Sequence, residues 1–172
     1  MKTVFVFGDR DSEKNEILSI VLKNYRNIAV IDFEDIFVKT LASLGKNEIN
    51  LQTALRDIDN AKKFKTLFVK ILKEEIKTLP KNKNIIVSGY FTIHTAYGDV
   101  ILLSEDFFKK HAPDAVIWME SENEKKTPPS REYAVVFSVI SGSVLKIIKI
   151  KPGNYREAIR ELEKTFRLLF GC

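Results

Sequence analysis

The stretch Val4-Phe-Val-Phe-Gly-Asp-Arg-Asp-Ser-Glu-Lys-Asn-Glu-Ile17 decides the fold predicted for the whole chain. Residues 2–8 are nearly all apolar and β-favouring, which is typical of a strand that is covered on both faces. A polar turn follows, and apolar residues at helical spacing predict a helix that begins near Ser12. Residues 28–32 form a second buried strand, so the chain opens with a strand–helix–strand unit of a parallel sheet.

The same patterns continue to the end of the chain and predict an α/β fold. Strands are expected at 84–90, 114–120 and 144–150, and helices at 34–44, 51–79 (one bent helix or two), 104–111, 131–141 and 155–170, with loops at 91–99 and 121–130. The prediction is one domain over residues 1–172, a five-stranded, mostly parallel sheet with helices on both faces. Residues 34–80 are expected to be a helical insertion between the second and third strands.

Composition restricts the function classes. Hydrophobic residues make up 45% and charged residues 30% of the 172, and no apolar run is long enough for a bilayer span, so we expect a cytoplasmic protein without a membrane partner. The single cysteine, Cys172, rules out a disulfide within the chain and fits a reducing compartment. Abundant Lys and Glu beside few His, Met and Cys favour a thermophilic source. The 28 basic and 23 acidic residues are intermixed without an aromatic–basic motif, which makes nucleic-acid binding the weakest hypothesis.

The turn after the first strand partly matches the phosphate-loop pattern Gly-x-x-x-x-Gly-Lys-Ser/Thr. Gly8 and Lys14 match, whereas Glu13 replaces the second glycine and Asn15 the hydroxyl residue. Lys14 could still pair with a phosphate oxygen and Asn15 could still offer a Mg²⁺ ligand. The alternative is that Asp11 or Ser12 caps the helix and that acidic residues complement its positive end. The candidate residues of this degenerate phosphate loop are Gly8, Asp9, Arg10, Asp11, Ser12, Glu13, Lys14 and Asn15.

Four segments together resemble the archaeal-type adenylate kinases, which belong to the nucleoside monophosphate kinase group. They are Ile31-Asp-Phe-Glu-Asp-Ile-Phe37, Asn84-Ile-Ile-Val-Ser-Gly-Tyr-Phe-Thr-Ile-His-Thr-Ala-Tyr-Gly98, Pro113-Asp-Ala-Val-Ile-Trp-Met-Glu120 and Val139-Ile-Ser-Gly-Ser-Val-Leu-Lys-Ile-Ile148. The resemblance implies a P-loop nucleoside monophosphate kinase-like fold, ATP and Mg²⁺ as cofactors, and residues 34–80 as the acceptor-nucleotide region. It also implies three acceptor-side candidates, Asp35, Arg56 and His94.

The departures from this family fall on the residues that do the chemistry. Ser88 stands where the third strand of the family ends in a metal-binding acid, and Asp32 is either its substitute or a helix cap. The acceptor helix lacks arginines near its start, and the lid is much shortened, with Lys125, Lys126 and Arg131 as its remnant. Because phosphoryl transfer depends on a metal and on positive groups over the phosphates, these losses argue against ordinary transfer and against firm ATP and Mg²⁺ binding.

Two hypotheses about function are therefore stronger than the hypothesis of a nucleic-acid-binding module. The first is an adenylate kinase-like protein with a degenerate site, which is catalytically inactive or binds nucleotide weakly and acts through a protein partner. The second is an active nucleotide or small-molecule kinase with a remodelled site that uses Lys14, Asn15 and Asp32.

Overall fold

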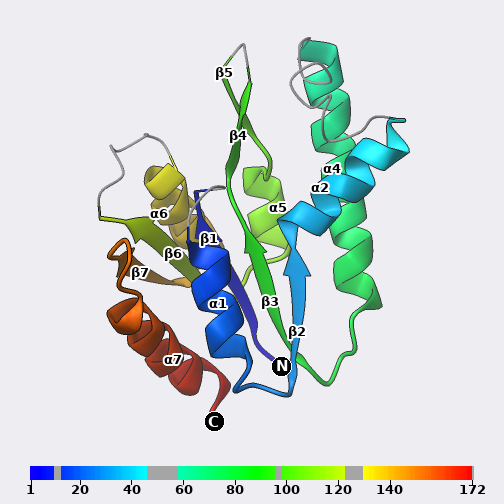
Figure 1. Cartoon of the computed structure of the whole chain (residues 1–172). Coiled ribbons are helices and arrows are strands. Elements are labelled where there is room, and N and C mark those ends of the chain that lie inside the picture. The colour runs from blue at the N-terminus through cyan, green and yellow to red at the C-terminus, as the bar shows by residue number, and fades with distance from the viewer. Residues whose placement is uncertain (10–12, 46–57, 96–97, 123–129, 172) are drawn as a thin grey trace.

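A computed structural model of the chain describes residues 1–9, 13–45, 58–95, 98–122 and 130–171. Its centre is a five-stranded sheet in the order β2-β3-β1-β6-β7, in which every neighbouring pair is parallel (Figure 1). The strands are β1 (Thr3–Gly8), β2 (Ile28–Asp32), β3 (Asn84–Gly89), β6 (Ala115–Ser121) and β7 (Val144–Ile150). The predicted five-stranded α/β fold is confirmed.

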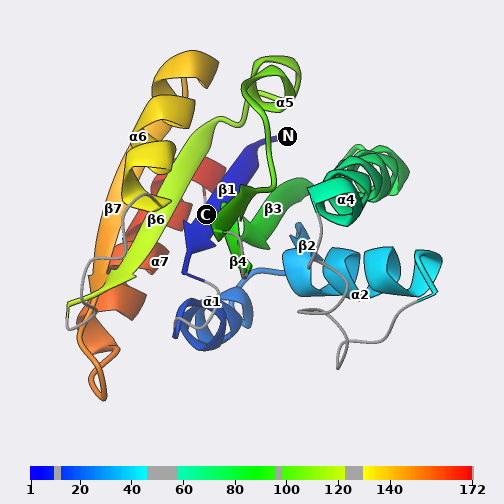
Figure 2. The same cartoon turned by 90° about the horizontal axis from the view of Figure 1, so that it is seen from above.

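Helices cover both faces of this sheet (Figure 2). Helices α1 and α7 pack on one face, and α2, α4, α5 and α6 pack on the other. Their bounds are α1 (Lys14–Leu22), α2 (Phe33–Ser43), α4 (Ile58–Thr78), α5 (Glu105–Lys110), α6 (Ser130–Ser141) and α7 (Arg156–Phe170). Helices α2 and α4 lie between β2 and β3, where the helical insertion is predicted.

The central strand β1 shows why the sequence folds this way. Its side chains alternate between the two faces, as in any strand. Phe5 and Phe7 join the aromatic core under α2, α4, α5 and α6, while Val4 and Val6 join an aliphatic core under α1 and α7. All four side chains are fully buried, which is why the opening stretch carries a continuous apolar run rather than an alternating one.

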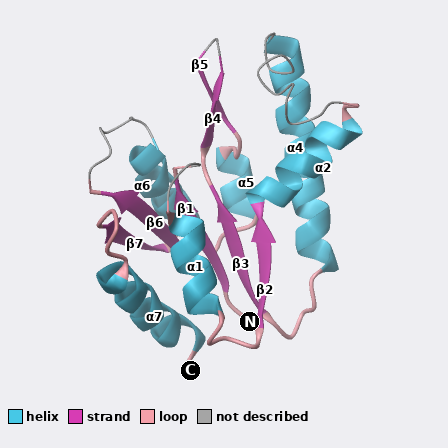
Figure 3. Cartoon of the chain, viewed as in Figure 1, coloured by secondary structure: helices cyan, strands magenta, loops and turns pink. Residues whose placement is uncertain are grey.

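The predicted loop over residues 91–99 is wrong in part. Strand β4 (Thr92–Thr95) pairs antiparallel with β5 (Gly98–Ile101) in a short hairpin beyond the carboxyl end of β3 (Figure 3). β-Branched residues favour the extended backbone of both strands. Gly98 supplies a positive φ of 119° at the start of β5, where a side chain would be strained.

Two helix starts also differ from the prediction. Helix α1 begins at Lys14 rather than near Ser12, and its N-cap residue Glu13 makes no capping hydrogen bond through its side chain. Helix α2 begins at Phe33, directly after β2. The first part of the predicted helix at 51–79 lies outside the described residues, and α4 from Ile58 onward is a single helix.

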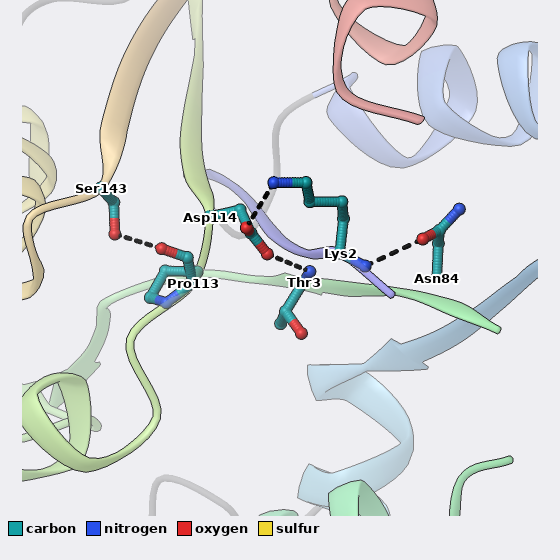
Figure 4. Close-up of polar contacts among 6 residues, drawn as sticks. All are labelled: Lys2, Thr3, Asn84, Pro113, Asp114 and Ser143. Carbon is teal, nitrogen blue, oxygen red and sulfur yellow. Dashed lines mark hydrogen bonds and ion pairs between the residues drawn. The ribbon is translucent and has the colours of Figure 1, made fainter. Parts of the chain in front are cut away.

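Polar side chains tie the amino ends of four strands together (Figure 4). Asp114 accepts hydrogen bonds from the Thr3 backbone N–H at 2.8 Å and from Lys2 Nζ at 3.0 Å. The Lys2 backbone N–H donates to Asn84 Oδ1 at 2.9 Å. Partial burial of Asp114 favours its neutral form, but the hydrogen bonds from Thr3 and Lys2 and the nearby positive charges outweigh it and lower the pKa of Asp114.

Over the ranges that the structure describes, none of the helices combines the length and the apolar character needed to cross a bilayer.

Candidate functional site

The candidate site lies at the carboxyl edge of the sheet, where β1, β2 and β3 end at Gly8, Asp32 and Gly89. The strand register places Ser88 opposite Val6 of β1 and opposite Asp32 of β2. Open parallel sheets bind ligands in the crevice outside the carboxyl ends of their strands. The fold therefore brings the predicted loop and the end of β3 to the place where a ligand would bind.

Lys14 points into the protein at this edge. It is the first residue of α1 and only 2% of its surface is exposed. Its Nζ donates to Ser88 Oγ at 2.7 Å and to Asn15 Oδ1 at 2.5 Å. Ser88 Oγ also donates to Asn15 Oδ1 at 3.2 Å, so the three side chains form a closed polar cluster, which we call the Lys14 cluster.

The surroundings of Lys14 change its acidity. Burial lowers the pKa of Lys14 from 10.5 to about 8, and the negative charges of Asp32 and Glu34 oppose this shift without cancelling it. A pKa of about 8 leaves about nine in ten molecules charged at pH 7. The site therefore holds an ammonium with two acidic residues near enough to influence it, a charge balance that disfavours a polyphosphate.

Asp32 acts as a helix cap in this structure. Its backbone is extended, with φ −103° and ψ 133°, and its side-chain Oδ1 accepts a hydrogen bond from the Glu34 backbone N–H at 3.0 Å. This is the geometry by which an N-cap residue satisfies a free N–H group of a helix. Of the two roles predicted for Asp32, the structure displays the cap.

The end of β3 is shaped by aromatic packing rather than by a metal-binding acid. A Cβ atom at Gly89 would lie 2.5 Å from Cγ and Cδ2 of the fully buried Phe33 ring. Only glycine allows α2 to approach β3 this closely. The residue after Ser88 is therefore fixed by the packing of α2 against the sheet.

The other loop candidates are only partly covered. Asp9 and Glu13 are half-buried, whereas Arg10, Asp11 and Ser12 lie outside the described residues. Partial desolvation, hydrogen bonding to Glu13 and the charge of Glu16 raise the pKa of Tyr155, at the start of α7. Glu13, which replaces the second glycine of the motif, thus interacts with α7.

Of the three acceptor-side candidates, the structure describes only the side chain of Asp35. Asp35 is exposed in the first turn of α2. His94 belongs to β4, where its backbone pairs with Asp99, and its side chain is outside the description. Arg56 lies outside the described residues.

Of the three lid candidates, only Arg131 is described. It is the second residue of α6, and its Nη1 lies 3.4 Å from Oε1 of Glu120 near the end of β6. Glu120 also accepts from Trp118 Nε1 at 3.1 Å, so Arg131 is paired with an acid already anchored to β6. Lys125 and Lys126 lie outside the described residues, in the short connection between β6 and α6.

Sequence reasoning identified Lys14 and Asn15 but treated Ser88 only as a missing acid. The signal that could have found it is a hydroxyl directly after the apolar run 85–87, at the end of a buried strand. A polar side chain in such a strand needs a partner, because burying it unpaired costs free energy. Among the described residues, no group of three or more His, Cys, Asp or Glu side chains could hold a metal ion.

Comparison with solved structures identifies the fold. The chain is similar to a thymidylate kinase from Candida albicans, with 10% identity, coverage of 97% of this chain and 91% of that one, and a TM-score of 0.52. It is also similar to TT1252 from Thermus thermophilus, with 12% identity, coverage of 98% and 97%, and a TM-score of 0.57. The chain has a P-loop kinase-like fold. A scan against models of known protein families finds no match, and neither does a search of curated proteins.

In P-loop kinases themselves, the turn after the first strand and the end of a neighbouring strand have defined chemical roles. The loop lysine contacts phosphate oxygens, and Mg²⁺ is held by the loop hydroxyl and a strand-end acid. The sequence motif predicts the lysine role for Lys14, whose described partners are side chains of the chain itself.

Proposed function

We propose that this chain is a nucleotide kinase-like protein of the archaeal adenylate kinase type whose phosphate site is degenerate. It binds a phosphate-bearing ligand, such as a nucleotide, weakly at the carboxyl edge of the sheet and does not catalyse transfer between nucleotides. Its role is to act through a protein partner in the cytoplasm.

The observation that carries the proposal is the position of the Lys14 ammonium. Among the described residues its two hydrogen-bond partners are Ser88 and Asn15, both side chains of the chain itself, and the lysine side chain is almost completely buried. These two bonds use two of the three N–H donors of the ammonium, so a phosphate that takes more than one hydrogen bond from this lysine must replace a bond that the ammonium already makes. Binding at such a site is weakened by the cost of breaking that bond, about 1 kcal/mol for each hydrogen bond.

The other residues at which a kinase would bind the metal and close over the phosphates also support the loss of phosphoryl transfer. A kinase active site neutralises the transferring phosphate with a metal and with positive side chains that close over it. Here Asp32 caps α2 and Arg131 pairs with Glu120. Strand β6 ends at Ser121 and α6 begins at Ser130, so the connection between them is too short for a lid of the family's kind.

Calorimetric titration with ATP, with and without Mg²⁺, tests this function. We expect a weak heat signal that the variant Lys14→Met abolishes and that the exposed-lysine control Lys70→Met retains. A coupled assay for ADP formation from ATP and AMP should show no turnover above the rate without protein. Turnover that Lys14→Met removes would refute the proposal, and so would a complete absence of binding.

One observation favours the second candidate, an active kinase with a remodelled site. Lys14 and Asn15 are in direct contact, and the carboxylate of Asp32 is near enough to oppose the fall of the Lys14 pKa that burial causes. These are the three side chains that a remodelled site would use. A panel of small hydroxylated and phosphorylated acceptors with ATP separates the two candidates, because only the second predicts consumption of ATP that depends on Asp32 and Lys14 together.

A further inference from the structure

The Lys14 cluster has a second property, which deepens the proposed function and rests on it. In a P-loop site, Mg²⁺ is held by the hydroxyl that follows the loop lysine and by the acid at the end of a neighbouring strand. The corresponding positions in this chain are Asn15 and Ser88. Their side-chain oxygens, Oδ1 and Oγ, lie 3.2 Å apart and both accept a hydrogen bond from the Lys14 ammonium.

We infer that the Lys14 ammonium takes the place of the metal, so that the site receives its phosphate-bearing ligand without Mg²⁺. The two oxygens that would face the metal face an internal cation instead, at 2.5 and 2.7 Å from Nζ. The Lys14 side chain is almost completely buried, and these two oxygens are its described acceptors.

The donor set does not fit Mg²⁺. This ion requires a near-octahedral shell of oxygens at about 2.0–2.1 Å and draws on carboxylates for charge. Ser88 supplies a neutral hydroxyl and Asn15 a neutral amide, while the carboxylate of Asp32 is hydrogen-bonded to the start of α2. The Lys14 ammonium also contacts both oxygens, and its charge repels a divalent cation.

The charge of the site sets the ligand class. The single positive charge of the ammonium stands in place of the two positive charges of Mg²⁺, and the negative charges of Asp32 and Glu34 partly balance it. The site therefore suits a single phosphate group that approaches Lys14 more than the folded-back polyphosphate of a Mg²⁺–nucleotide complex. Metal-free ADP and ATP carry such a phosphate group at the end of their phosphate chain and serve as probes.

Amide chemical shifts in ¹⁵N-labelled protein give a site-specific test. Metal-free ATP, in the presence of a chelator, should shift the amides of Gly8, Lys14 and Ser88, and Lys14→Met should weaken that binding about tenfold or more. Adding Mg²⁺ should either change the dissociation constant by less than about threefold or weaken the binding. Tightening by about tenfold with Mg²⁺ overturns this inference and leaves the proposed weak binder standing, whereas no shift with either form overturns both.

A second measurement does not depend on a nucleotide. Mn²⁺, which is paramagnetic and takes oxygen ligands as Mg²⁺ does, should leave the amides of Asn15 and Ser88 unbroadened in the native protein. Selective broadening of these two amides would overturn the inference. The double variant Lys14→Met with Ser88→Asp removes the ammonium and restores a strand-end acid, so it should gain that broadening, while Lys70→Met should not. A folded double variant that stays unbroadened counts against the inference, and the Mn²⁺ result on the native protein decides it if the variant does not fold.

Discussion

Replacing Lys14 by methionine should make the protein more stable at neutral pH. Methionine has nearly the length of lysine and a similar helix propensity, but it carries no charge into the interior. The fall of the Lys14 pKa from 10.5 to about 8 means that folding costs the charged side chain about 3 kcal/mol relative to its neutral form. Loss of the two described hydrogen bonds of Nζ offsets about 2 kcal/mol, at about 1 kcal/mol for each bond. The expected net gain is about 1 kcal/mol.

The stability advantage of Lys14→Met over the native protein should depend on pH. Below about pH 8 the lysine is protonated in both the folded and the unfolded states, and the cost of burial is fully present. Between about pH 8 and 10.5 the folded state releases its proton first, so the native protein recovers stability as the pH rises. Urea unfolding of the native protein, Lys14→Met and the exposed control Lys70→Met should show the advantage of Lys14→Met shrinking over this range. An advantage that does not change with pH, or a variant less stable than the native protein at pH 7, would refute the argument that desolvation dominates.

Three further changes test the packing and the capping of the fold. Gly89→Ala should lower the free energy of unfolding by about 1–3 kcal/mol because its Cβ meets the Phe33 ring, and adding Phe33→Leu should restore part of the loss in urea unfolding. Asp114→Asn should cost about 0.5–1 kcal/mol at neutral pH, since this partly exposed carboxylate has a lowered pKa. Its stabilisation is present above pH 3.8 and is lost as the pH falls through the folded-state pKa, so stability curves of the variant and the native protein should converge in acid. Ser104→Ala should cost about 1 kcal/mol by thermal unfolding and Ser104→Asp much less, because Ser104 caps α5; equal losses would contradict the capping role.

Local patterns were sufficient to predict the sheet. The runs 2–8, 28–32, 84–90, 114–120 and 144–150 each gave a strand within a residue or two of the observed bounds, because a strand buried on both faces must be apolar throughout. The helix predicted at 104–111 was confirmed as α5 for a similar reason, since the hydrogen bond by which Ser104 caps it is local. The β4–β5 hairpin was missed because its four-residue strands carry too little periodicity to distinguish them from a loop.

The candidate site depended on contacts that sequence patterns do not contain. Lys14 and Ser88 are 74 residues apart, and only the pairing of β1 with β3 brings them within 2.7 Å. That the lysine side chain points into the protein follows from this tertiary contact. Asp32 was ambiguous for a different reason: an acid at the junction of a strand and a helix is suited to both capping and metal binding, and only the hydrogen bond to Glu34 distinguishes them.

The polar ties among Lys2, Thr3, Asn84 and Asp114 have a practical consequence for how the molecule can be handled. They lie at the amino edge of the sheet, and both chain termini are at that end, away from the β4–β5 hairpin (Figures 1 and 4). A surface or a reporter attached through either terminus would therefore lie at the end of the sheet opposite the candidate site, and the carboxyl edge would stay exposed to the solution. The protein can be immobilised for capture of ligands or partners without masking the end at which we expect them to bind.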